Sequence, residues 1–278
     1  MVDVATFQNN NKKNFLISIT IVTVSFNAVK TIEQTILSVI NQTYSNFEYI
    51  IIDGGSVDGT LDIIKKHAHN ISYWTSEPDK GIYDAMNKGV VAAKGDYIIF
   101  LGADDTLTES CVIEKAASEI ANNSFPDIWC GSVRVIDKSL NLCKEYYPMY
   151  NNKVELSKMA LFHQSVFAKK NLLLEHKFDA SLQIVADYEF FCWCAFNKRS
   201  ISTGNLCIAN FSMGGVSVTR VIKAFYERQK VLRRYAPNSN QVSVFLNLVK
   251  CYCQFFLKSI LLKCRLLHQI RLLSGWKR

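Results

Sequence analysis

Two adjacent carboxylates, Asp104 and Asp105, come shortly after the uncharged run Tyr97–Leu101. Such a run is typical of a strand that is covered on both faces of an α/β sheet. Ligands bind beyond the carboxyl ends of such strands, so we expect the two acids at a ligand site. Carboxylate oxygens suit Mg²⁺ or Mn²⁺, and the pair is therefore a candidate metal site. The alternative is a structural role, with Asp105 as the N-cap of a helix that begins near Thr108.

Two further acids stand where elements are expected to meet. Asp53 ends a predicted strand and is followed by Gly54 and Gly55. Its carboxylate can accept a hydrogen bond from a base or a ribose, although a plain turn is the alternative reading of this segment. Asp187 precedes the apolar run Phe190–Trp193, where the residues alone favour a helix N-cap.

The elements that must position these acids alternate along the chain. β-Branched residues fill a first strand within Phe15–Phe26, and apolar spacing predicts a helix over Thr31–Asn41. Further strands are expected at 47–53, 71–76, 97–101 and 128–136, with helices at 60–69, 82–93 and 110–122. Strands alternating with helices of this length predict βαβ units and a mainly parallel sheet.

Several familiar sites are missing from this framework. The chain has no G-x-G-x-x-G after its first strand and no G-x-x-x-x-G-K-[ST], which argues against dinucleotide and P-loop sites. Its nine cysteines form no C-x-x-C pair, and several lie in apolar runs. We therefore expect a reducing compartment and no disulfide framework.

Charge divides the chain at position 217. Residues 1–217 hold 19 Lys and Arg against 23 Asp and Glu, a net charge of −4, whereas residues 218–278 hold 13 against the single Glu227, a net charge of +12. A basic segment beside a mildly acidic domain indicates a polyanionic partner, either nucleic acid or an anionic membrane face. No recognisable nucleic-acid-binding motif is present, so a nucleic-acid partner is not expected.

A helix is predicted within the basic segment, from about Val242 to Leu267. It combines a wide apolar face with a narrow polar stripe, and Lys250 and Lys258 near its middle argue against a membrane span. The pattern favours a helix that lies in an anionic membrane interface. Packing of the helix on the catalytic domain is the alternative.

Taken together, the motifs resemble the family 2 glycosyltransferases, which have the GT-A fold, over at least residues 16–217. The branch most similar makes bacterial surface polysaccharide such as colanic acid or O antigen. The segments that carry the resemblance are Thr23–Asn27, Asp53–Thr60, Glu77–Gly89, Gly95–Tyr97, Leu101–Asp105, His163–Ser165, Ala186–Tyr188 and Phe211–Ser217. The implied organisation is an α/β GT-A domain over residues 1–217, Rossmann-like and flanked by helices, followed by a basic amphipathic helical tail over residues 218–278 that associates with the membrane.

The resemblance also implies a role for each matching residue. Asp187 corresponds to the catalytic base. Asp104 takes the last position of the family's D-x-D motif and would hold Mg²⁺ or Mn²⁺ with help from Asp105 or water, because Gly102 stands where the first acid is expected. His163 and Gln164 are candidates for contact with the acceptor, and a structural role is the alternative for His163. The implied donor-binding residues are Thr23, Ser25, Asn27, Asp53, Asp79 and Asp104.

The implied reaction is an inverting transfer from a nucleotide sugar, expected to be a UDP-sugar, to a polyprenyl-diphosphate-linked saccharide. The chain has no Q-x-x-R-W segment, which the polymerising members carry, so the transfer is expected to be non-processive. The enzyme would act in the cytoplasm, peripherally on the inner face of the bacterial membrane. Two alternatives stay open: transfer to polyprenyl phosphate, and a catalytically inactive partner that binds a nucleotide sugar.

Overall fold

The computed structural model describes residues 17–150, 156–213, 220–237 and 267–277. Its strands are β1 (Ile19–Ser25), β2 (Phe47–Asp53), β3 (Tyr73–Ser76), β4 (Tyr97–Gly102), β5 (Thr106–Leu107), β6 (Ile128–Asp137), β7 (Leu142–Tyr146), β8 (Val166–Lys169) and β9 (Ile201–Ser212). Its α-helices are α1 (Ile32–Ile40), α2 (Thr60–Lys66), α3 (Ile82–Ala92), α4 (Val112–Asn122), α5 (Lys170–Glu175), α6 (Ala186–Phe196), α8 (Val221–Tyr235) and α10 (Leu267–Leu273). Short 3₁₀ helices are η2 (Ala68–Asn70), η3 (Leu156–Lys158) and η4 (His163–Ser165).

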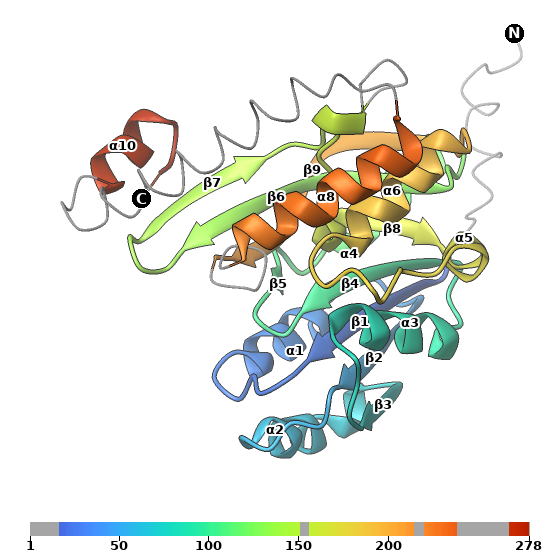
Figure 1. Ribbon diagram of the computed structural model, residues 1–278. Helices are drawn as coiled ribbons and strands as arrows, with labels where there is room; N and C mark the ends of the chain where they lie inside the picture. The colour runs from blue at the N-terminus through green and yellow to red at the C-terminus, as the bar shows by residue number, and fades with distance from the viewer. Residues whose placement is uncertain (1–16, 151–155, 214–219, 238–266, 278) are drawn as a thin grey trace, which may run out of the picture.

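Within the described residues these strands form one sheet in the order β3-β2-β1-β4-β8-β6-β9-β5, with β7 paired to β6 (Figure 1). Strands β3, β2, β1 and β4 are mutually parallel. Strand β8 runs antiparallel between β4 and β6, and β6 pairs in parallel with β9. The predicted α/β fold with a mainly parallel sheet is confirmed, and the departures are β8 and the edge strands β5 and β7.

Helices cover both faces of the sheet, because alternate side chains of the central strands point to opposite sides. Val22 and Val24 of β1 belong to a core that includes residues of α3, α5 and α6. Ile19 and Ile21 belong to a second core that includes residues of α1, α2 and α4. The uncharged run Tyr97–Leu101 makes up β4 apart from Gly102, and its alternate residues belong to the two cores, as expected for a strand buried on both faces.

The strand register brings the predicted site segments to one edge of the sheet. Ser25 at the end of β1 lies opposite Asp53 at the end of β2, and Val24 lies opposite Gly102 at the end of β4. Because β1 lies between β2 and β4, the loops that follow all three strands begin side by side.

The alternative interpretation of Asp105, as the N-cap of a helix that begins near Thr108, is wrong. Helix α4 begins at Val112 with Cys111 as its N-cap, and Thr106 and Leu107 form β5 against β9. The Asp105 carboxylate instead accepts hydrogen bonds from the backbone N–H groups of Gly102 at 3.0 Å and Ser212 at 3.4 Å.

Described parts of the basic segment pack on the domain rather than extending from it. Val231 and Leu232 of α8 are buried in the core that contains α6, and α8 lies beside α6 (Figure 1). Trp276 packs on β6 and β7, where Lys277 pairs through its backbone with Cys143. Position 217 is therefore a boundary in charge, and the packed structure continues beyond it.

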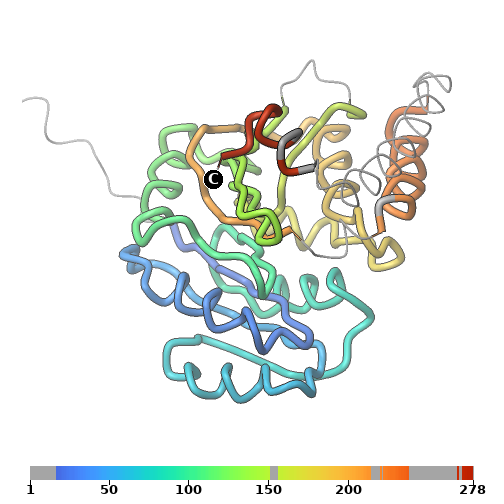
Figure 2. Tube along the Cα trace, turned by 90° about the vertical axis from the view of Figure 1, so that its left-hand side faces the viewer, coloured from blue at the N-terminus to red at the C-terminus, as the bar shows by residue number. Residues whose placement is uncertain are grey.

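Helices α8 and α10 occupy different places on the domain. A view turned by 90° shows α10 and the C-terminus beside the β6–β7 hairpin, away from α8 (Figure 2). Except for its last residue, the interfacial helix predicted from Val242 to Leu267 lies outside the described residues. Among the helices that are described, none has both the length and the apolar character needed to cross a bilayer.

Candidate active site

Asp53 organises the edge of the sheet from a fully buried position. Its carboxylate accepts hydrogen bonds from the hydroxyls of Ser25, Ser56 and Ser76 at 2.6–2.8 Å, and from the backbone N–H groups of Gly55 and Ser56. Burial raises the pKa of Asp53, but these hydrogen bonds outweigh burial and the pKa lies below its usual value. The side chain therefore holds the loops after β1, β2 and β3 together, and its predicted contact with the base remains a prediction.

The other predicted donor-binding residues lie on β1 or directly after it, and their side chains differ in exposure at the edge of the sheet. The Thr23 hydroxyl lies in the core, 3.0 Å from the Tyr49 hydroxyl, so its side chain is not presented to a ligand. Ser25 is also buried, against Asp53. Asn27 is exposed and accepts a hydrogen bond from the backbone N–H of Val57 at 3.1 Å. Of these three residues, Asn27 alone offers its side chain to solvent at the edge.

Asp79 reaches the same edge from the loop that precedes α3. Its carboxylate accepts a hydrogen bond from the Gly81 N–H at 2.8 Å and lies over Gly54. A Cβ atom placed on Gly54 would stand 2.5 Å from the carboxylate oxygen of Asp79, so a larger residue there would displace this carboxylate. Phe26, whose exposed fraction is 64%, stands beside Gly54 and was not singled out from the sequence. Its position directly after a buried strand was the available signal.

Asp104 and Asp105 follow β4 with different exposures. Asp105 is 1% exposed, its carboxylate accepts a hydrogen bond from the Gly102 backbone, and the Gln164 side chain beside it lowers its pKa. Burial, together with the charge of Asp104, raises the pKa of Asp105 to about 6. Burial also raises the pKa of Asp104, which is partly exposed. Asp104 is thus the member of the pair that can meet a ligand, with Asp105 as a buried charge behind it.

Gly102 gives the Asp104 carboxylate room to fold back on the strand. A Cβ atom at Gly102 would lie 3.1 Å from a carboxylate oxygen of Asp104 and 3.0 Å from one of Asp105. The space in which an acid at position 102 would begin is therefore bordered by the two carboxylates that follow.

Asp187 lies in the first turn of α6, two residues after the N-cap Val185, so it is not the N-cap residue itself. One carboxylate oxygen is 2.9 Å from Nδ1 of His163, and the other is 3.0 Å from the Tyr83 hydroxyl and 2.8 Å from the Tyr188 N–H. Tyr83 was not predicted as a site residue. A buried tyrosine needs a partner for its hydroxyl, which was the available signal.

The electrostatics of this cluster keep Asp187 charged. Burial raises its pKa, but the hydrogen bond and charge of His163, the Tyr188 N–H and the Tyr83 hydroxyl outweigh burial, so the pKa is lowered. Burial lowers the pKa of His163, but Asp187 and the charges of Asp105 and Asp104 outweigh it, so that pKa is raised. The Asp187 and His163 side chains remain 19% and 18% exposed. A carboxylate of this kind can still receive a proton from a bound hydroxyl.

Two neighbouring residues of η4 connect the acids. His163 contacts Asp187, and Gln164, which is buried, contacts Asp105. Gln164 therefore turns away from solvent, and its predicted contact with the acceptor remains a prediction. The fold thus brings together into one cluster residues that are far apart in the sequence, namely residues 83, 104–105, 163–164 and 187.

The residues at Asp104 and Asp105 fit a divalent cation. Among the described side chains, no group of three or more His, Cys, Asp and Glu is arranged to hold a metal by itself. Mg²⁺, however, is usually bound by one or two carboxylates together with substrate phosphates and water. The raised pKa values of both acids show that negative charge is unfavourable there, which a cation would relieve.

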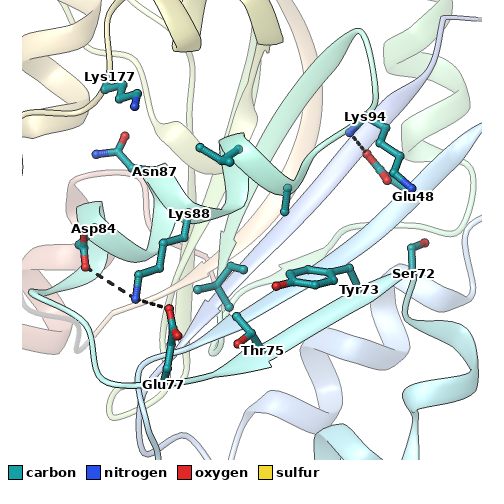
Figure 3. A pocket seen from close by; sticks show the side chains of 13 residues that line it. Glu48, Ser72, Tyr73, Thr75, Glu77, Asp84, Asn87, Lys88, Lys94 and Lys177 are labelled. Carbon is teal, nitrogen blue, oxygen red and sulfur yellow. Dashed lines mark hydrogen bonds and ion pairs between the residues drawn. The ribbon is translucent and has the colours of Figure 1, made fainter.

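A separate open groove of about 610 Å³ lies between β3 and α3 (Figure 3). Lys88 is paired with Glu77 at 2.8 Å in this groove, and Lys94 and Lys177 also line it. None of the site residues predicted from the sequence lines it. The candidate active site is therefore the cluster of acids at the edge of the sheet, and this groove lies apart from it.

Residues 20–199 match the family model for glycosyl transferase family 2. The chain belongs to this family. It is a glycosyltransferase with the GT-A fold, and the matched range contains the ends of β1, β2 and β4 as well as Asp187.

Relatives of known sequence and structure agree with this assignment. The chain is 32% identical over 197 residues to the PGL/p-HBAD biosynthesis glycosyltransferase of Mycobacterium bovis, covering 69% of this chain and 75% of that one. It is 29% identical over 157 residues to the cholesterol galactosyltransferase of Borreliella burgdorferi, covering 54% and 43%. It superposes on S. aureus TarS in complex with UDP-GlcNAc with a TM-score of 0.64 at 17% identity, covering 86% and 73%. Against a longer TarS chain it spans 39% of the length.

Proposed function

We propose that this glycosyltransferase is inverting and non-processive, and that it moves a sugar from a UDP-sugar to a polyprenyl-diphosphate-linked saccharide. The observation that carries the proposal is the cluster in which His163 and Gln164 connect Asp187 to the Asp104–Asp105 pair. A single displacement needs a base for the acceptor hydroxyl and stabilisation of the leaving diphosphate, and the cluster holds a candidate for each.

The donor would lie over the carboxyl ends of β1, β2 and β4. Phe26 offers an exposed aromatic face there, and a nucleobase can stack on such a face for about 1–3 kcal/mol. Asn27 and Asp79 are polar groups at the same edge, and Ser25 and Asp53 hold that edge in shape. A UDP-sugar is proposed because a structural neighbour binds UDP-GlcNAc, although another, a mannosyltransferase from Pyrobaculum calidifontis, is bound to GDP-Man and Mn²⁺.

Asp187 would act as the general base. Its lowered pKa keeps the carboxylate ionised, and it takes the proton of the acceptor hydroxyl as that oxygen bonds to C1 of the sugar. The bond from C1 to the diphosphate breaks with its electron pair on the leaving oxygen. One displacement inverts the configuration at C1. His163 and Tyr83 hold the two carboxylate oxygens, which fixes their direction.

Mg²⁺ or Mn²⁺ would be held by Asp104 next to the donor diphosphate, with Asp105 contributing charge. When bound, the cation neutralises charge on the leaving diphosphate, an effect worth several kcal/mol. Burial of Asp105 behind Asp104 keeps its negative charge close to the cation site without exposing it to water.

We also propose that the enzyme acts at the cytoplasmic face of the bacterial inner membrane, in the synthesis of surface polysaccharide such as O antigen, capsule or colanic acid. Support comes from the net charge of +12 over residues 218–278, which suits an anionic lipid surface. A relative named for cholesterol as its acceptor likewise acts on a lipid.

Liposome flotation tests the membrane proposal. Full-length protein should float with vesicles that contain anionic lipid and release them as salt is raised, because headgroup attraction is screened. A chain that ends at Asn240 should float less. Equal flotation of the two would contradict a membrane role for the segment after Asn240.

A transfer panel tests the reaction. UDP- and GDP-sugars would be offered with and without Mn²⁺, together with polyprenyl diphosphate linked to a first sugar. Mn²⁺-dependent product from a UDP-sugar is expected. Product on polyprenyl phosphate alone would favour that acceptor instead. Donor binding without transfer to either acceptor would favour an inactive nucleotide-sugar-binding partner.

A further inference from the structure

We propose that Glu227 of helix α8 is a positioning residue for Asp187, acting through the backbone at Ile184 and through Tyr83. This inference rests on the proposed role of Asp187 as the base. It gives the described start of the basic segment a function within the active site, where the sequence indicated a separate tail.

Glu227 holds the chain directly before α6. Its two carboxylate oxygens accept hydrogen bonds from the backbone N–H groups of Gln183 at 3.1 Å and Ile184 at 2.9 Å. No other acid occurs in residues 218–278. A carboxylate that accepts two backbone N–H groups fixes both of them in direction as well as in distance.

The next contact leads from Ile184 to the base. The Tyr83 hydroxyl lies 2.7 Å from the Ile184 carbonyl oxygen and 3.0 Å from the Asp187 carboxylate, so its proton is shared between them. Burial and the charge of Asp187 raise the pKa of Tyr83 well above its usual range, so the hydroxyl keeps its proton and remains a donor. Glu227 and Tyr83 thus hold the two ends of Ile184, three residues before Asp187.

Helix α8 is fixed to α6 by contacts that do not involve Glu227. The Arg228 guanidinium lies 3.9 Å from the centre of the Tyr188 ring and donates to the carbonyl of Ser157 at 3.0 Å. Arg234 and the Tyr235 hydroxyl both donate to the buried Glu189 carboxylate. Because these contacts remain when Glu227 is replaced, the helix should stay docked while the 183–184 backbone loses one acceptor.

The deciding variant is Glu227→Gln. Its side-chain amide can accept from one backbone N–H but presents an NH₂ group to the other, which loosens Ile184. We expect kcat to fall about 10-fold or more with donor KM nearly unchanged, since small displacements of a catalytic group are costly. The titration midpoint of the His163 imidazole should move to lower pH, because Asp187 is held less firmly against it. The midpoint would be followed by NMR, and the His163 signal would be assigned by its loss in the His163→Gln variant.

The matched control is Tyr235→Phe, which removes a contact between α8 and α6 at the C-terminal end of α8, about two turns beyond Glu227. It should lower the melting temperature without changing kcat or the His163 midpoint. A His163 midpoint that stays at its wild-type value in Glu227→Gln would overturn the inference. The inference would also be overturned if Tyr235→Phe lowered both kcat and the His163 midpoint as much as Glu227→Gln does, at the same loss of melting temperature. Wild-type protein without transfer activity would count against the proposed function, while the His163 titration would still decide the role of Glu227.

Discussion

Replacement of Asp187 by asparagine is expected to lower kcat by about 10²–10⁴-fold, the usual contribution of a positioned general base. The amide has nearly the same shape but cannot accept the acceptor's proton. Donor binding should be preserved, because the groups at the ends of β1 and β2 are untouched. The measurement is single-turnover transfer at saturating donor, together with calorimetric titration of the nucleoside diphosphate.

Asp179→Asn is the matched control for Asp187→Asn. Asp179 lies on the loop before α6, where its carboxylate accepts hydrogen bonds from Ser181 and is 3.6 Å from Arg234. It should transfer sugar at close to the wild-type rate. If Asp187→Asn and Asp179→Asn were equally active, Asp187 would not be the base.

Replacement of Asp104 by asparagine should lower Mn²⁺-dependent transfer by about 10²–10³-fold, because the cation contributes several kcal/mol to the departure of the diphosphate. The variant should also lose the rise in melting temperature that Mn²⁺ with nucleoside diphosphate gives the wild-type protein. Thermal unfolding with and without Mn²⁺, followed by rate measurements at several Mn²⁺ concentrations, would test both effects.

The same site predicts a pH dependence in the wild-type protein. The pKa of Asp105 is raised to about 6, so below that pH its carboxyl is protonated and the pair loses negative charge. The Mn²⁺ concentration for half-maximal rate should therefore rise as the pH falls from 7 to 5. A Mn²⁺ requirement that is unchanged over this range, or an Asp104→Asn variant with normal Mn²⁺ response, would contradict the metal assignment.

Much of the framework was predictable because local patterns agree with the tertiary fold. The strand predicted at 47–53 is β2, and its run of isoleucines is buried between the two helical layers. The helix predicted over Thr31–Asn41 is α1, whose buried residues Ile32, Ile36 and Val39 follow the predicted face. The acids after β2 and β4 were found for the same reason, as polar residues that directly follow buried runs.

The contacts between distant segments were harder to predict. The pairing of His163 with Asp187 joins η4 to α6, and no local pattern states that these two segments meet. Thr23 was expected among the donor-binding residues, and its hydroxyl lies in the core beside Tyr49, so any contact with the donor through this residue stays a prediction.

The docking of α8 was missed because charge dominates the C-terminal composition. Residues 227, 231, 232 and 235 nevertheless share one side of the helix, and they include the buried Val231 and Leu232. This helical spacing could have predicted a buried face, but the basic residues between these positions made the segment look like a solvent-exposed or membrane-bound helix.

The configuration of the sugar in the transferred product tests the account most directly. A donor with an α-linked nucleoside diphosphate should give only β-linked product, determined by the coupling constant of the anomeric proton, because Asp187 supports one displacement at C1. An α-linked product would require a second displacement or a different mechanism, and it would contradict the assignment of Asp187 as the base of an inverting glycosyltransferase.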